Sequence, residues 1–117
     1  MAYGKHHRAK RISLVDIFVR IKRLILTQRV IFTEKAEREM YTDGLTQSMV
    51  FEAVINAPAI TKTIRSRQPR SRRRELLYVI KGLTYDGVAI YTKGKIARFR
   101  GQEVFYVLVS SKRSTDV

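Results

Sequence analysis

The chain has 117 residues, of which 24 are Lys or Arg and 10 are Asp or Glu, so its formal net charge is +14 at pH 7. It contains no Cys, which excludes disulfides, zinc–thiolate sites and a Cys nucleophile. No apolar run approaches the roughly 20 residues of a membrane span, and no secretory signal is visible. We therefore expect one cytoplasmic domain with no membrane partner and no cofactor.

Positive charge is concentrated in two stretches. Residues 1–30 carry eight basic residues and one acidic residue, and residues 61–75 carry seven and one. Such a field attracts polyanions, so nucleic acid or an acidic protein is the expected partner. The alternative is a basic surface that only keeps the protein soluble. Residues 1–11 lack apolar periodicity and are expected to form a flexible basic arm.

Residues 12–57 are expected to be the helical part of the domain. Ser13 is a good N-cap residue, and the apolar residues after it recur at helical spacing, which predicts a helix over 14–28. Thr33 caps a second helix, whose first turn is acidic, and Asp43-Gly44 ends it.

The change from helix to strand is predicted at Pro58. Thr46 begins a third helix, which must end before Pro58 because proline lacks the amide hydrogen and restricts the residue before it. The next stretch, 59–66, alternates apolar and polar residues, as a strand at a sheet edge does. Residues 58–112 are therefore expected to form the sheet part of the domain.

Three apolar runs rich in Val, Ile and Tyr predict a β-meander at residues 75–81, 87–93 and 104–111. The Asp86-Gly87 pair supplies the positive φ that the first turn needs. These elements predict an α+β fold, in which N-terminal helices pack on a small, mainly antiparallel sheet.

One face of this sheet is the expected functional surface. Alternation along the middle strand puts Tyr91 and Lys93 on the same face. Tyr78, Lys81 or Tyr106 from neighbouring strands can join them, depending on the register. Aromatic and basic side chains on one sheet face suit single-stranded RNA, whose bases stack on aromatic rings.

Basic loops are expected beside the sheet. Residues 68–74 are either a solvated connection or a phosphate clamp, because each Arg there can bind two phosphate oxygens at once. Residues 93–95 and 98–101 are expected to be two further basic turns.

The residue types favour one kind of catalysis. Neither His6 nor His7 lies near an acidic residue in the sequence, and no Gly-rich phosphate loop occurs, so the common hydrolase sites are poorly supported. Metal-independent RNA cleavage needs only Lys, Arg and Tyr, because the ribose 2′-hydroxyl is itself the nucleophile. Composition does not separate cleavage from binding.

Between Val54 and Lys112 lie three short motifs: VINAPAITKTI, GVAIYTK and VLVSSK. They resemble the MqsR-like toxins of bacterial toxin–antitoxin systems, within the RelE-like superfamily. The resemblance implies a RelE-like fold and RNA cleavage, with Lys62, Tyr91 and Lys112 as catalytic residues. The expected RNA contacts are Arg65, Arg70, Arg72, Arg73, Arg74, Lys93 and Arg98.

The expected function is that of an mRNA endoribonuclease toxin, which acts on RNA, free or on the ribosome, and is neutralised by a cognate acidic antitoxin. Two other classes stay open. A non-catalytic nucleic-acid-binding module would bind RNA with a steep salt dependence and leave it intact. A basic protein-interaction domain would bind an acidic partner and have little affinity for RNA.

Overall fold

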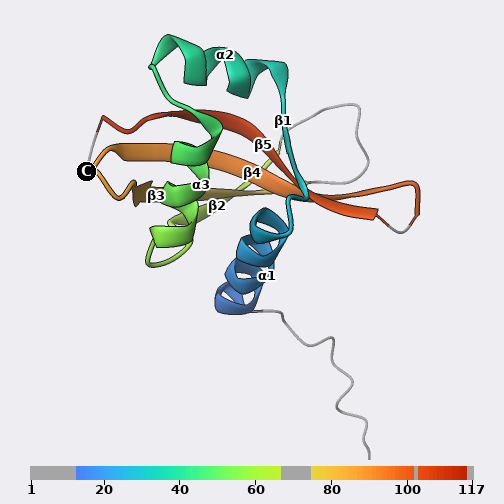
Figure 1. Ribbon diagram of the computed structural model, residues 1–117. Coiled ribbons are helices and arrows are strands. Elements are labelled where there is room, and N and C mark those ends of the chain that lie inside the picture. The colour runs from blue at the N-terminus through green and yellow to red at the C-terminus, as the bar shows by residue number, and fades with distance from the viewer. Residues whose placement is uncertain (1–12, 67–74, 102, 116–117) are drawn as a thin grey trace, which may run out of the picture.

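The computed structural model describes residues 13–66, 75–101 and 103–115, which form three helices and one five-stranded sheet (Figure 1). The elements are, in chain order, α1 (Leu14–Leu26), β1 (Val30–Phe32), α2 (Glu34–Thr42), α3 (Gln47–Asn56), β2 (Lys62–Arg65), β3 (Leu76–Leu83), β4 (Ala89–Phe99) and β5 (Glu103–Arg113). The predicted α+β class is confirmed. The predicted basic arm and the predicted basic loop at 68–74 lie outside the described residues.

The sheet has the strand order β1-β5-β4-β3-β2. The predicted meander is confirmed, since β3, β4 and β5 are successive antiparallel neighbours, and β2 pairs antiparallel with β3 at one edge. The other edge strand, β1, pairs parallel with β5 and was not predicted. The part of the chain expected to be helical, residues 12–57, therefore also contains one short strand. A strand of three residues gives too little alternation to be distinguished from a connection between two helices.

Local capping explains where the helices begin. The side-chain oxygens of Ser13, Thr33 and Thr46 each accept a hydrogen bond of 3.1 Å from the backbone N–H three residues later. The predicted helix starts are thus confirmed, while α1 ends at Leu26 rather than at residue 28. Within the described parts of the chain, no helix is long and apolar enough to cross a membrane.

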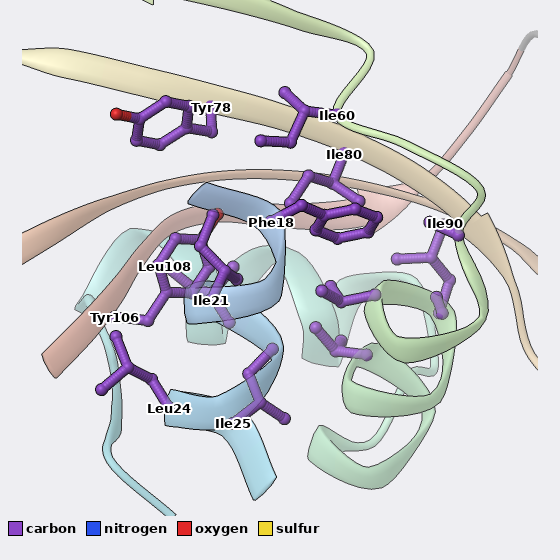
Figure 2. Packing of buried hydrophobic residues seen from close by; sticks show 14 of the residues in the cluster. Phe18, Ile21, Leu24, Ile25, Ile60, Tyr78, Ile80, Ile90, Tyr106 and Leu108 are labelled. Atoms are coloured by element: carbon purple, nitrogen blue, oxygen red, sulfur yellow. The ribbon is translucent and has the colours of Figure 1, made fainter. Parts of the chain in front are cut away.

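One face of the sheet carries the core, on which all three helices pack (Figure 2). Ile80 and Ile90 from the sheet and Ile21 from α1 are fully buried there. Tyr78 and Tyr106 also point into this core, so the expectation that either could lie beside Tyr91 is wrong. The opposite face of the sheet, which carries Tyr91, is called the outer face below.

The turns of the meander differ in part from the prediction. Gly87 has a φ of +85°, as the Asp-Gly pair predicted, within a loop that is closed by a backbone hydrogen bond from Thr84 to Val88. Residues 93–95 were expected to be a basic turn but lie inside the 11-residue strand β4. Of the basic turn expected at 98–101, residues 98 and 99 belong to strand β4, whereas Arg100 and Gly101 form the turn, in which Gly101 has a φ of +74°.

Candidate functional site

A row of three side chains crosses the outer face of the sheet. In the β3–β4 register Lys81 lies opposite Tyr91, and in the β4–β5 register Tyr91 lies opposite Lys112. Directly opposed residues in neighbouring strands project from the same face, and neighbouring strands lie about 4.8 Å apart. Tyr91 is therefore flanked by one lysine on each side. We call Lys81, Tyr91 and Lys112 the cationic row.

The cationic row borders a pocket of about 500 Å³ at the end of the sheet. Lys112 is exposed, whereas Lys81 and Tyr91 are half-buried. The Lys112 Nζ lies 5.5 Å from the centre of the Tyr91 ring, within the range of a cation–π interaction. Two amino groups and a phenol beside one open pocket can bind an anion and donate protons to it. The pocket is lined by Asp43, Lys81, Tyr91, Lys112, Arg113, Ser114 and Thr115.

Hydrogen bonds that β5 donates to carboxylates of helix α2 and of its C-cap residue hold β5 on both sides of Lys112. The carboxylate of Glu39 accepts hydrogen bonds from Ser110 Oγ at 2.8 Å and from the Ser111 N–H at 3.0 Å. After Lys112, the Arg113 N–H donates to Asp43 Oδ2 at 2.8 Å. The backbone of Lys112 is therefore fixed from both directions, which positions its side chain next to Tyr91.

The ionisation of Glu39 depends on these contacts. Partial burial of Glu39 opposes its negative charge, but hydrogen bonds from Ser110, Ser111 and Lys35 outweigh burial, and the net effect lowers the pKa of the carboxyl from its usual value of 4.5. Glu39 is thus ionised at neutral pH, when its carboxylate can accept all three hydrogen bonds.

Of the three predicted catalytic residues, Tyr91 and Lys112 come together and Lys62 lies apart. Lys62 pairs with Val79 on the edge strand β2. Strand spacing and rise put its Cα about 12 Å from that of Tyr91. Lys81 occupies the place next to Tyr91 instead, because the register of the β3–β4 hairpin brings it there. The exposed Lys62 still lies on the outer face, in the row next to the cationic row.

The predicted RNA contacts are spread over several places. Lys93 is half-buried on the outer face, two residues from Tyr91. Arg65 is three residues from Lys62 along β2, so its side chain points to the face of the sheet opposite the outer face. Arg98 also alternates to the opposite face and lies about 23 Å along β4 from Tyr91. Arg70, Arg72, Arg73 and Arg74 lie outside the described residues.

Sequence reasoning missed the residues that complete the site. Lys81 was considered only as one of three possible neighbours of Tyr91, and the correct register would have selected it. Glu39 was not considered, and Asp43 was expected only to end the second helix. No local signal in the sequence connects them with β5, because the contacts join residues about 70 positions apart.

Comparison with protein-family models, with curated proteins and with solved structures finds no match to this chain. The family suggested by the three short motifs therefore stays a prediction. Within residues 13–66, 75–101 and 103–115, no three His, Cys, Asp or Glu side chains are grouped so that they could hold a metal ion. The function has to be inferred from the cationic row and its surroundings.

Proposed function

We propose that this chain is an endoribonuclease that cleaves single-stranded RNA without a metal ion, and that it acts as the toxin of a toxin–antitoxin system. The observation that carries the proposal is the cationic row, in which Tyr91 lies between Lys81 and Lys112 beside an open pocket. A phosphodiester bound there meets positive charge on both sides and a phenol in the middle.

The charge of the chain supports an RNA substrate. A net charge of +14 attracts any polyanion. The outer face adds Lys93 and Lys62 in the row next to the cationic row, so a strand that leaves the pocket meets further positive charge. Single-stranded RNA suits this surface better than a duplex does, because its flexible backbone can follow the groups on a sheet.

The proposed chemistry uses groups of the cationic row, of the RNA and water. The ribose 2′-oxygen attacks the adjacent phosphorus, the bond from phosphorus to the 5′-oxygen breaks, and a 2′,3′-cyclic phosphate and a 5′-hydroxyl result. The 2′-hydroxyl gives up its proton to water, and the phenol of Tyr91 gives its proton to the leaving 5′-oxygen and is then reprotonated by water. The ammonium groups of Lys81 and Lys112 stabilise the extra negative charge on phosphorus.

A cell that makes such an enzyme needs to control it, so the proposal includes an acidic antitoxin that covers the cationic row. Its charges would mainly speed association, and burial of Tyr91 would slow dissociation. Expression of the intact chain should arrest bacterial growth, and the double variant Tyr91→Phe/Lys112→Ala should relieve the arrest. A small acidic protein should co-purify from the native host and block RNA binding.

The test of the catalytic assignment is a single-turnover cleavage assay with single-stranded RNA and excess chelator. Tyr91→Phe removes only the proton donor and should lower the cleavage rate by about 100-fold or more while RNA affinity stays close to that of the wild type. Arg23 is exposed on α1, which packs on the core face of the sheet, so Arg23→Gln removes one charge outside the outer face and is the matched control for lysine variants. Equal cleavage rates for Tyr91→Phe and the wild type would reject the catalytic role of Tyr91.

A further inference from the structure

Two phenylalanines lie at the far end of the outer face from the cationic row. Phe105 is opposite Ala97, and Phe99 is opposite Glu103 near the tip of the β4–β5 hairpin. Ala97 and Phe99 lie an even number of residues from Tyr91 along β4, so both phenylalanines project from the face that carries Tyr91. Figure 1 shows this hairpin extending beyond the rest of the sheet.

The two rings form one aromatic surface, in which Phe99 is exposed and Phe105 is half-buried. Their centroids are 5.7 Å apart in an edge-to-face arrangement, and Phe99 is 41% exposed. The guanidinium carbon of Arg29, from the segment before β1, lies 5.9 Å from the centre of the Phe105 ring. The carbonyl of Arg29 accepts a hydrogen bond of 3.0 Å from the Tyr106 N–H, which holds this segment beside β5. We call Arg29, Phe99 and Phe105 the aromatic platform.

The surroundings of the platform favour an anionic ligand with flat, apolar parts. Arg100 is exposed at the same end of the hairpin, Arg98 projects from the opposite face of the sheet, and Glu103 is the acidic residue opposite Phe99. An exposed ring next to guanidinium groups is poorly suited to an aliphatic protein surface, since the cations would lose their hydration without gaining a partner. A nucleobase stacks on both rings and guanidinium planes, and its phosphate neutralises the arginines.

The platform and the cationic row are joined by further basic side chains. Ala97, the partner of Phe105, is six residues from Tyr91 along β4, which corresponds to about 20 Å. Lys93 and Lys95 project from the same face between the two sites. The Lys95 Nζ forms a 3.0 Å ion pair with Glu75, the residue before β3, so the Lys95 side chain is directed toward β3. An RNA strand several nucleotides long can therefore contact both ends of the face.

We propose that the aromatic platform is a base-stacking subsite, which binds nucleobases of the same single-stranded RNA several nucleotides away from the phosphate held by the cationic row. This inference rests on the proposed RNA substrate, but not on cleavage. Such a subsite makes the enzyme selective for RNA that is unpaired from the cationic row to the aromatic platform. A base in a duplex is stacked on its neighbours and cannot lie on the platform.

Tryptophan fluorescence tests the subsite directly, because the chain contains no Trp. Phe99→Trp places the single indole on the platform, and the exposed Tyr41 on α2 provides Tyr41→Trp as the control. The probe is a single-stranded RNA of about 12 nucleotides, a length within the range of single-strand binding sites, with 2′-O-methyl groups that prevent cleavage. Saturation of the protein with this RNA should quench the Trp emission of Phe99→Trp at least twofold and leave that of Tyr41→Trp unchanged. Saturation without quenching in Phe99→Trp would overturn the subsite.

A second measurement separates this inference from the proposed function. Phe105→Leu keeps an apolar side chain in β5 but removes the ring, and it should weaken binding of the same RNA by about fivefold or more. Tyr41→Leu is the matched control and should bind as the wild type does. Unchanged affinity in Phe105→Leu would overturn the subsite even if the wild type cleaves RNA. Conversely, quenching in Phe99→Trp together with a wild type that binds RNA but never cleaves it would reject the endoribonuclease and keep the subsite.

Discussion

The ring of Tyr106 lies directly against Gly94, because a Cβ atom added at Gly94 would be 2.5 Å from Tyr106 Cζ. Tyr106 is fully buried in the core, and Gly94 belongs to the neighbouring strand β4. The β4–β5 register shifts between Lys93 and Gly94, so the close approach coincides with an irregularity of the ladder. A glycine inside a strand here marks the approach of a large side chain.

Gly94→Ala should therefore destabilise the domain, by about 1–3 kcal/mol in the free energy of unfolding, because the added methyl group overlaps the Tyr106 ring. Urea denaturation followed by circular dichroism measures the change. A Tyr106→Leu background removes the overlapping atoms, so in that background the same substitution should cost much less. Equal losses in the free energy of unfolding in the two backgrounds would show that overlap with the Tyr106 ring does not cause the destabilisation.

Tyr106→Phe should leave the free energy of unfolding unchanged or raise it by about 1 kcal/mol. The Tyr106 hydroxyl is buried and has no hydrogen-bond partner within the described parts of the chain, so the native state gains little from it. Burial, with a smaller effect of Tyr78, also raises the pKa of Tyr106 far above its usual value of 10.0. The folded state therefore disfavours the phenolate.

The pH dependence of Tyr106→Phe gives a second, independent comparison. The pKa of Tyr106 is higher in the folded state than in the unfolded state, so above pH 10 the unfolded chain loses this proton more readily than the folded protein does. Ionisation of Tyr106 therefore leaves the free energy of unfolding unchanged below pH 10 and lowers it as the pH rises above that value. The wild type should therefore lose more stability than Tyr106→Phe above pH 10. Parallel curves for the two proteins would contradict the burial of an un-ionised hydroxyl.

Glu39→Gln should destabilise the domain by about 1–2 kcal/mol at neutral pH, because it weakens the hydrogen bonds that Glu39 accepts from Ser110, Ser111 and Lys35. The folded pKa of Glu39 is lowered, so this stability is present above about pH 4.5 and is lost as the pH falls through the folded value. Unfolding curves of both proteins from pH 7 to pH 3 should thus converge on the acid side. A constant difference would show that the charge of Glu39 is not involved.

Lys81 should matter more for RNA cleavage than Lys62 does. Lys81→Met removes an ammonium group next to Tyr91, whereas Lys62→Met removes one at the sheet edge. We expect a loss of about 100-fold or more in single-turnover rate for Lys81→Met and mainly weaker RNA binding for Lys62→Met. The reverse order would favour the site that the sequence motifs suggest, with Lys62 in the catalytic set.

Short-range signals made most of the fold predictable. Capping residues gave the starts of the helices, and the apolar runs gave the strands of the meander. Strand β1 escaped prediction because its three residues are stabilised by pairing with β5, more than 70 positions away in the sequence. Residues 93–95 looked like a turn because Gly94 lies between two lysines, although that glycine serves the close approach of Tyr106.

The site was only partly predictable because it depends on register. A two-residue turn at Asp86-Gly87 would have paired Tyr91 with Gly82 and placed no lysine of β3 opposite it. The actual loop is longer, because the Thr84 hydroxyl accepts a hydrogen bond from the Val88 N–H and closes the hairpin there. That one-residue difference brings Lys81 opposite Tyr91.

The role of the ribose 2′-hydroxyl provides the decisive measurement. The purified chain should be incubated, with excess chelator, with a single-stranded all-ribose RNA and with the same strand in which every 2′-hydroxyl is methylated. Both strands should bind, but only the all-ribose strand should be cut, with products that end in a 2′,3′-cyclic phosphate and a 5′-hydroxyl. An all-ribose strand that binds and stays intact, or a methylated strand that is cut at the same rate, would contradict cleavage by the cationic row.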